Sequence, residues 1–153
     1  MTTAARIGAW RTFIEASIRL QTELDDRLRR DAGLSLSDFN VLLTLSEAPD
    51  RRLRLGELAE AMVYSASRLT YQSKVLAGRG WVERQDVPED GRGQYLRLTD
   101  AGAAALDRAR VTHGRDVDEL FQSRVRDDEV TVIGRVFARL GAERIDSRRA
   151  TAQ

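Results

Sequence analysis

Apolar residues recur every three to four positions over much of this chain, which is the spacing of helices with one apolar face. Residues from about Ile7 to Arg30 predict a long first helix, whose apolar or small positions are Trp10, Phe13, Ile14, Ser17, Leu20, Leu24 and Leu28. Ser35 and Asp38 are spaced as in a capping box, so we expect a second helix there that Pro49 ends. A third long helix is expected after Thr99, with a stripe at Ala101, Ala105, Ala109, His113, Val117, Leu120 and Phe121.

The C-terminal part of the chain predicts one more helix. Residues 127–129 are all acidic, which suits the positive end of a helix dipole. Coiled-coil-like spacing follows at Val130, Ile133, Phe137 and Leu140, and the polar tail from Asp146 is expected to fray. Because the apolar stripes at both ends of the chain exceed what one small unit can bury, we expect a two-fold homodimer.

Residues 53–99 have a different pattern. Residues 53–55 predict a short strand, Gly56 begins a short helix, and Ser65 is the N-cap of a second helix that Gly80 ends. Residues 81–85 and 95–98 alternate as two strands, and the segment between them, rich in Pro and Gly, predicts a hairpin. This order of elements is typical of a helix-turn-helix followed by a β-wing, in which the second helix enters the DNA major groove.

The second of these helices has one face rich in hydrogen-bond donors. With Leu69 taken as the core direction and 100° per residue, the wheel places Ala66, Ser73, Leu76 and Ala77 on the same side. The opposite side and its flanks carry Ser67, Arg68, Thr70, Tyr71 and Lys74. Such side chains are what base edges and phosphates require. The other interpretation is a solvated helix face, and the adjoining wing favours DNA.

The tip of the hairpin offers a cation to the minor groove. Gly91 and Gly93 allow the tip a positive φ, so Arg92 can project into a narrow groove of negative potential. Asp90 could hold the Arg92 side chain by a charge-assisted hydrogen bond. The alternative is an ordinary turn aspartate beside a solvated arginine.

Composition narrows the possible functions. The chain has 153 residues, which fits one domain, and a net charge of +1. Residues 51–97 hold 9 basic and 6 acidic side chains, so the positive excess lies on the winged segment. With no cysteine, one histidine and no phosphate-binding loop, the chain predicts no enzyme, metal site or cofactor. It has no apolar run for a signal peptide or membrane span, so we expect a cytoplasmic protein without membrane partners.

Four segments resemble the multiple antibiotic resistance regulator (MarR) family over about fifty residues in register. They are Ser65-x-Ser67-Arg68-Leu69-Thr70-Tyr71-Gln72, Gly80-Trp81-Val82-x-Arg84, Asp90-Gly91-Arg92 and Leu98-Thr99-x-x-Gly102. The resemblance implies a bacterial homodimeric winged-helix regulator that binds a palindromic operator in double-stranded DNA. It further implies a repressor released by a small phenolic or anionic effector. Ser73 departs from the family pattern, which usually has an aliphatic residue there.

The expected fold is therefore mainly α with a small β-wing, as one domain over residues 1–153. Residues 36–99 would form the winged helix-turn-helix region, and residues 1–34 and 100–146 a helical dimerisation region. In the family plan the first and last helices of both subunits interlock, which assigns dimerisation to Ile7, Val130, Ile133, Phe137 and Leu140. DNA binding is assigned to Ser65, Ser67, Arg68, Thr70, Tyr71 and Lys74 on the helix and to Asp90 and Arg92 on the wing.

Three aromatic residues and the one histidine have two interpretations. Trp10, Phe13 and Phe39 have the spacing of core residues, and His113 is expected in the core or a dimer contact with one hydrogen bond. The resemblance makes all four candidates for an effector pocket, since the family's pocket lies between the dimer domain and the winged unit. The rival class of function is a winged-helix module that binds only another protein. The donor-rich face and Arg92 favour DNA.

Overall fold

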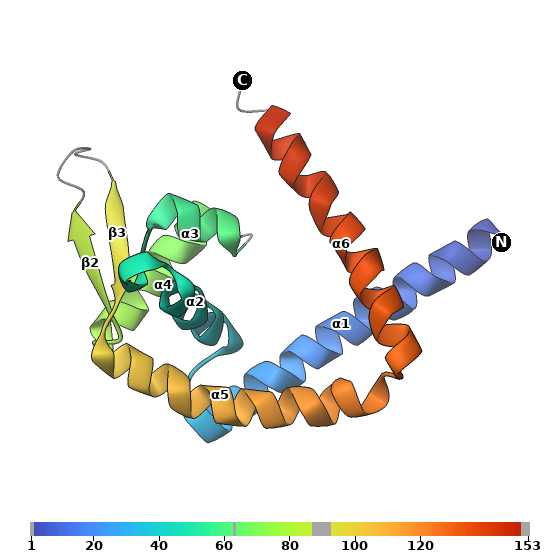
Figure 1. Ribbon diagram of the computed structural model, residues 1–153, viewed down its shortest axis with the longest axis horizontal. Coiled ribbons are helices and arrows are strands. Elements are labelled where there is room, and N and C mark those ends of the chain that lie inside the picture. The colour runs from blue at the N-terminus through green and yellow to red at the C-terminus, as the bar shows by residue number, and fades with distance from the viewer. Residues whose placement is uncertain (1, 63, 87–92, 151–153) are drawn as a thin grey trace. The chain divides into compact units, whose positions relative to one another are not determined.

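The computed structural model describes residues 2–62, 64–86 and 93–150, with side chains up to residue 140. It is mainly helical with one three-stranded antiparallel sheet, which confirms the expected fold class (Figure 1). The chain divides into two compact units, Met1–Asp116 and Val117–Gln153. The division by role into a winged region and a dimerisation region stays a prediction. Within the described ranges, each helix is too short or too polar to span a membrane.

The first unit begins with two capped helices, α1 (Thr3–Ala32) and α2 (Leu36–Glu47). Helix α1 begins earlier than predicted, because the Thr2 hydroxyl accepts a hydrogen bond from the Ala5 amide and caps the helix there. It ends at Gly33, whose φ of 73° suits glycine. The capping box of α2 is confirmed: the Asp38 amide donates to Ser35 Oγ and the Ser35 amide to Asp38 Oδ2, both at 3.0 Å.

The winged segment follows the expected order with shifted boundaries. It comprises the 3-10 turn η1 (Pro49–Arg51), β1 (Arg52–Arg54), α3 (Leu55–Ala61), α4 (Ala66–Gly78), β2 (Val82–Asp86) and β3 (Gln94–Leu98). The prediction of Leu55 as a strand residue and Gly56 as the helix start is wrong. The Arg54 amide donates to Glu57 Oε2 at 3.0 Å, and this contact caps α3 so that the helix begins at Leu55. Ser65 is confirmed as the N-cap of α4.

The sheet has the strand order β1-β3-β2, with Leu53 opposite Leu96 and Val82 opposite Leu98. Helix α2 packs on β3, and α4 packs on β2 and α3, so the three helices gather beside the β2–β3 hairpin (Figure 1). Leucine predominates in the core between these elements: Leu28, Leu34, Leu42, Leu45, Leu58, Leu69, Leu76, Leu96, Leu98 and Leu106, with Phe39, Val41, Ala59, Val82 and Ala109 among them. Each fully buried leucine contributes about 1.5–3 kcal/mol to folding, so this core fixes where α4 lies.

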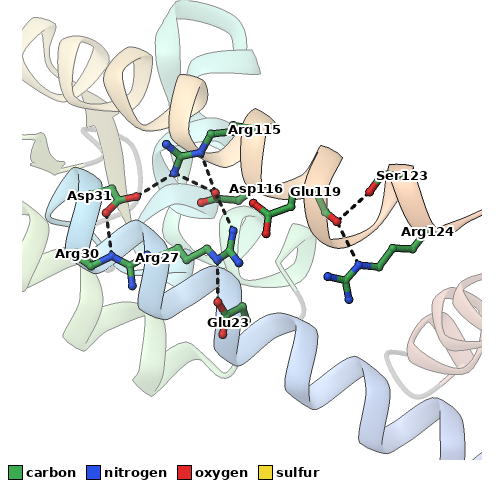
Figure 2. Close-up of polar contacts among 9 residues, drawn as sticks. All are labelled: Glu23, Arg27, Arg30, Asp31, Arg115, Asp116, Glu119, Ser123 and Arg124. Atoms are coloured by element: carbon green, nitrogen blue, oxygen red, sulfur yellow. Dashed lines mark hydrogen bonds and ion pairs between the residues drawn. The ribbon is translucent and has the colours of Figure 1, made fainter.

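Helix α5 (Asp100–Leu120) joins the first unit through an ion cluster with α1. Asp116 is fully buried, and its Oδ1 lies 3.4 Å from Arg27 Nη1 and 3.0 Å from Arg115 Nη2. Arg115 Nη2 also donates to Asp31, and Arg27 Nε to Glu23 (Figure 2). Two guanidinium groups therefore compensate the negative charge of the buried carboxylate. Without them, an unpaired charge in the interior would destabilise the fold.

The second unit contains the end of α5, the 3-10 turn η2 (Gln122–Arg124) and α6 (Asp127–Ala150). Ser123 Oγ and Arg124 Nε both donate to the carbonyl oxygen of Glu119 near the end of α5, where the last carbonyls of a helix need partners outside the helix (Figure 2). The predicted start of α6 is confirmed. Helix α6 continues past Asp146 to Ala150, and the fraying expected there stays a prediction.

Candidate nucleic-acid interface

Helix α4 has a buried side that the helical wheel predicted with one error. Leu69, Ser73 and Leu76 are buried, as expected. Ser73 satisfies its hydroxyl locally by donating to the Thr70 carbonyl oxygen at 2.9 Å, which explains how a polar residue is accommodated at an apolar position. Ala66 is exposed, so its assignment to the core side is wrong: it lies in the first turn, ahead of the packed part of the helix.

The opposite side of α4 faces solvent. Ser67, Arg68, Thr70 and Lys74 are exposed, and Tyr71 is 72% exposed. Three of these side chains have local partners. Ser67 Oγ lies 3.2 Å from Ser65 Oγ, Thr70 Oγ1 donates to the Ala66 carbonyl oxygen at 2.8 Å, and the Arg68 guanidinium lies 4.1 Å from the centre of the Tyr64 ring. The arrangement presents hydroxyl, phenol, ammonium and guanidinium groups on one surface, which can donate to base edges and phosphates. Their contact with DNA stays a prediction.

A chain of buried polar contacts fixes α4 against the start of α2. Ser37 Oγ lies 2.9 Å from the Tyr64 hydroxyl and 2.8 Å from Gln72 Oε1, and Gln72 Nε2 donates to Asp38 Oδ1 at 3.1 Å. Gln72 Oε1 can only accept, so the single Ser37 proton goes to Gln72 and the Tyr64 hydroxyl donates to Ser37. These contacts were not predicted from the sequence, although Gln72 closes the motif that begins at Ser65.

The strands of the wing carry cations and their partners. Arg97 Nη2 pairs with Glu83 at 2.9 Å, and the Arg84 guanidinium donates to the Gln94 side-chain oxygen. Arg52 lies 5.1 Å from the centre of the Tyr95 ring. The residues assigned to the tip, Asp90 and Arg92, lie outside the described residues.

The four candidates for an effector pocket form two pairs. The rings of Trp10 and Phe13 are 5.9 Å apart on α1, and those of Phe39 and His113 are 4.4 Å apart. Phe39 is a core residue, as expected, whereas Trp10 is 62% exposed, so its assignment to the core is wrong for the single chain. A pocket formed by these four residues stays a prediction.

His113 differs from the expectation of one hydrogen bond. Its Nδ1 atom is buried and has no hydrogen-bond partner among the described residues. Burial lowers the pKa of the His113 imidazole below its usual 6.5, and the nearby Asp116 charge opposes this shift. The His113 ring is therefore favoured in its neutral form, which suits its tilted contact with the Phe39 ring.

A short helix with a donor-rich exposed face, a leucine core behind it and a following hairpin define a winged helix-turn-helix protein. The comparisons agree: the model of the MarR family matches residues 32–93. The chain is 32% identical over 111 residues to the transcriptional repressor YetL of Bacillus subtilis, covering 71% of this chain and 66% of that repressor. It is 31% identical over 120 residues to the multiple antibiotic resistance protein MarR of Escherichia coli, covering 76% of this chain and 82% of that protein.

A solved structure extends the likeness over nearly the whole chain. Sco3205 of Streptomyces coelicolor, a MarR family regulator determined in complex with DNA, superposes with a TM-score of 0.87 and 37% identity. The likeness covers 94% of this chain and 89% of that one. The chain belongs to the MarR family of transcriptional regulators.

Proposed function

We propose that this regulator binds double-stranded DNA sequence-specifically and represses transcription from a palindromic operator as a homodimer. The observation that carries the proposal is the exposed face of α4, where Ser67, Thr70, Tyr71 and Lys74 point away from a core that holds the helix rigidly. A groove-reading helix needs donors on a fixed support, and both are present. Structures such as that of Sco3205 with DNA support it by analogy. Such a regulator would act in the cytoplasm.

Apolar exposure supports the homodimer. On α1, Ile7 is 55% exposed and Ile18 59%, and on α6, Val130 and Leu140 are each 53% exposed. Large apolar side chains gathered along helices mark interaction surfaces when they exceed isolated exposed residues. We assign these stripes to the contact between two copies of the chain, as Ile7, Val130, Ile133, Phe137 and Leu140 were assigned from the sequence.

The wing and the effector complete the proposal. Arg92, with Asp90 two residues before it, would contact the minor groove, so Arg92→Ala should weaken binding broadly and remove a preference for narrow A·T minor grooves. A small phenolic or anionic effector would bind near Trp10, Phe13, Phe39 and His113 and release the DNA. Titration of the protein–DNA complex with salicylate tests the effector site. Release of DNA from the wild type at salicylate concentrations that do not release it from His113→Ala would support the site.

Selection from a pool of random duplexes tests the function directly. The full-length protein is mixed with the pool at physiological salt, and bound DNA is recovered, amplified and sequenced over several rounds. We expect enrichment of an inverted repeat with half-sites about 10 base pairs apart, one helical turn, because a two-fold protein presents two copies of α4. A pool that stays random would contradict sequence-specific binding and favour a protein-interaction module.

A further inference from the structure

One side of α4 borders a pocket that the groove-reading face does not explain. The pocket has a volume of about 380 Å³ and lies within the first unit, between the end of α1, the start of α2 and α4. Its lining includes Arg29, Ser37, Arg68, Tyr71, Gln72 and Arg79. On α4 the lining residues Arg68, Tyr71, Gln72 and Val75 recur at three- and four-residue spacing, so they lie on one stripe, and Arg79 is the C-cap residue directly after the helix. Three guanidinium groups therefore surround a single concave site.

Two of these cations keep their charge available. The Arg79 guanidinium lies 4.8 Å from the centre of the Trp81 ring and donates through Nη1 to the Gly33 carbonyl oxygen at 2.9 Å. Arg68 lies over the Tyr64 ring and reaches Ser37 Oγ only at 3.5 Å. In the described part of the chain, neither arginine forms an ion pair. Each guanidinium has five N–H donors, so most of them remain for a ligand.

The acidic groups at the pocket are already engaged. Asp38 lines it, and its two carboxylate oxygens accept from the Ser35 amide and from Gln72 Nε2. Arg29 is paired with Asp25 at 2.7 Å, and Asp25 also accepts from the Leu36 amide at the start of α2. The first amides of α2 are thus occupied by the protein itself. Against the single Asp38 carboxylate of the lining, Arg68 and Arg79 therefore supply an excess of positive charge.

We propose that this pocket binds an oxyanion of the phosphate type, and that in the DNA complex the oxyanion is a backbone phosphate beside the groove that α4 enters. Arginine matches phosphate oxygens in a bidentate way, and such contacts position a protein without reading sequence. The pocket shares Arg68 and Tyr71 with the exposed face of α4, so a phosphate held here would set the depth and register of the helix. This inference rests on the proposed function.

The backbone is the favoured source of the oxyanion because both cations are exposed. A free anion gains little binding free energy at solvated arginines. A phosphate of a bound duplex is held at the same place by all the other contacts between the protein and the DNA. Arg68 thereby becomes a positioning residue rather than a reader of base edges.

The salt dependence of DNA binding tests the proposal. Dissociation constants are measured across a range of salt concentrations for the wild type, Arg79→Gln and Arg68→Gln, with the selected duplex and a permuted one. We expect each variant to reduce the slope of log K against log salt by about 1 per subunit. Each should also weaken binding to both duplexes by the same factor. Arg19→Gln is the matched control, because it removes the same charge about 15 Å along α1 from Arg29 and should leave the slope unchanged.

The outcomes separate the two proposals and the two sources of phosphate. Thermal unfolding first confirms that the variants fold. Unchanged slopes in both Arg79→Gln and Arg68→Gln, with wild-type DNA binding intact, would overturn the pocket and leave the proposed function standing. A titration of inorganic phosphate into DNA-free protein, followed by amide NMR, covers the other source. Shifts at Ser37 and Arg79 together with unchanged slopes would assign the site to a free oxyanion and contradict the backbone assignment.

Discussion

Gly102 shows how a single residue position depends on a close backbone approach. A Cβ atom there would lie 2.0 Å from the Trp81 carbonyl oxygen and 2.8 Å from Leu98 Cδ1. The Gly102 amide also donates to Thr99 Oγ1 at 3.0 Å, so the first turn of α5 cannot move away freely. This contact explains the glycine of the Leu98-Thr99-x-x-Gly102 motif and places the hairpin directly against α5.

We predict that Gly102→Ala destabilises the fold by about 1–3 kcal/mol, the usual cost of overpacking. Gly114→Ala is the matched control on the same helix, because its added Cβ meets nothing within 4 Å. The control should stabilise α5 by up to about 1 kcal/mol through helix propensity. Denaturant unfolding at one fixed protein concentration measures both. Equal effects of the two substitutions would contradict the packing described.

The single histidine predicts a pH dependence of stability. Burial lowers the folded pKa of His113, so the unfolded chain binds the proton more tightly. The resulting stability is present above the unfolded pKa of 6.5 and is lost as the pH falls through the lower folded pKa. The free energy of unfolding should therefore fall on acidification from pH 7 to 5.5, and less so in His113→Gln. Identical pH profiles for the two proteins would refute this role.

Base reading is the residue-scale prediction for α4. Alanine at Ser67 or Thr70 should cost about 1–3 kcal/mol with the selected duplex if that side chain contacts a base edge, and should relax specificity at one position of the operator. Thermal stability should stay unchanged, because both side chains are exposed. Repeating the selection with each variant measures the specificity. A uniform loss on all sequences would reassign the residue to phosphate contact.

At the scale of elements, most of the fold could be predicted because its signals are local. The capping box at Ser35, the N-cap at Ser65 and the alternating strands each depend on residues within a few positions, and the sequence predicted all three. The sequence did not predict the contacts between distant elements. Gln72 meets Asp38 across 34 positions, and Arg27 meets Asp116 across 89. Nothing in helical spacing reveals such pairs, since they exist only once the core is packed.

Helix α6 gives the element-scale prediction. Ending the chain after Arg126 removes Val130, Ile133, Phe137 and Leu140 and should abolish dimerisation, because these residues carry the exposed apolar stripe. Val130→Glu should weaken the dimer without removing the helix, whereas Thr131→Glu, also exposed and next in sequence, should not. Sedimentation velocity at micromolar concentration measures each assembly. A folded wild-type monomer under these conditions would contradict the assigned interface.

For the whole molecule, we propose that a leucine-rich core supports the exposed face of α4 and that a symmetric dimer presents two copies of this face to DNA. The core and the exposed face belong to the first unit, and both are described by the structure. In the proposed dimer, two-fold symmetry would place two copies of α4 on an inverted repeat. Its DNA binding should therefore depend on both the sequence and the spacing of the half-sites.

The most direct measurement compares dissociation constants for three duplexes at physiological salt: the selected inverted repeat, the same half-sites moved apart by 5 base pairs, and a permuted sequence. Specific binding should exceed binding to the permuted duplex by about 10³-fold or more. The 5-base-pair insertion should remove most of that preference, because it rotates one half-site to the opposite side of the helix. Equal affinity for all three duplexes would contradict the proposal that α4 of a symmetric dimer reads an operator.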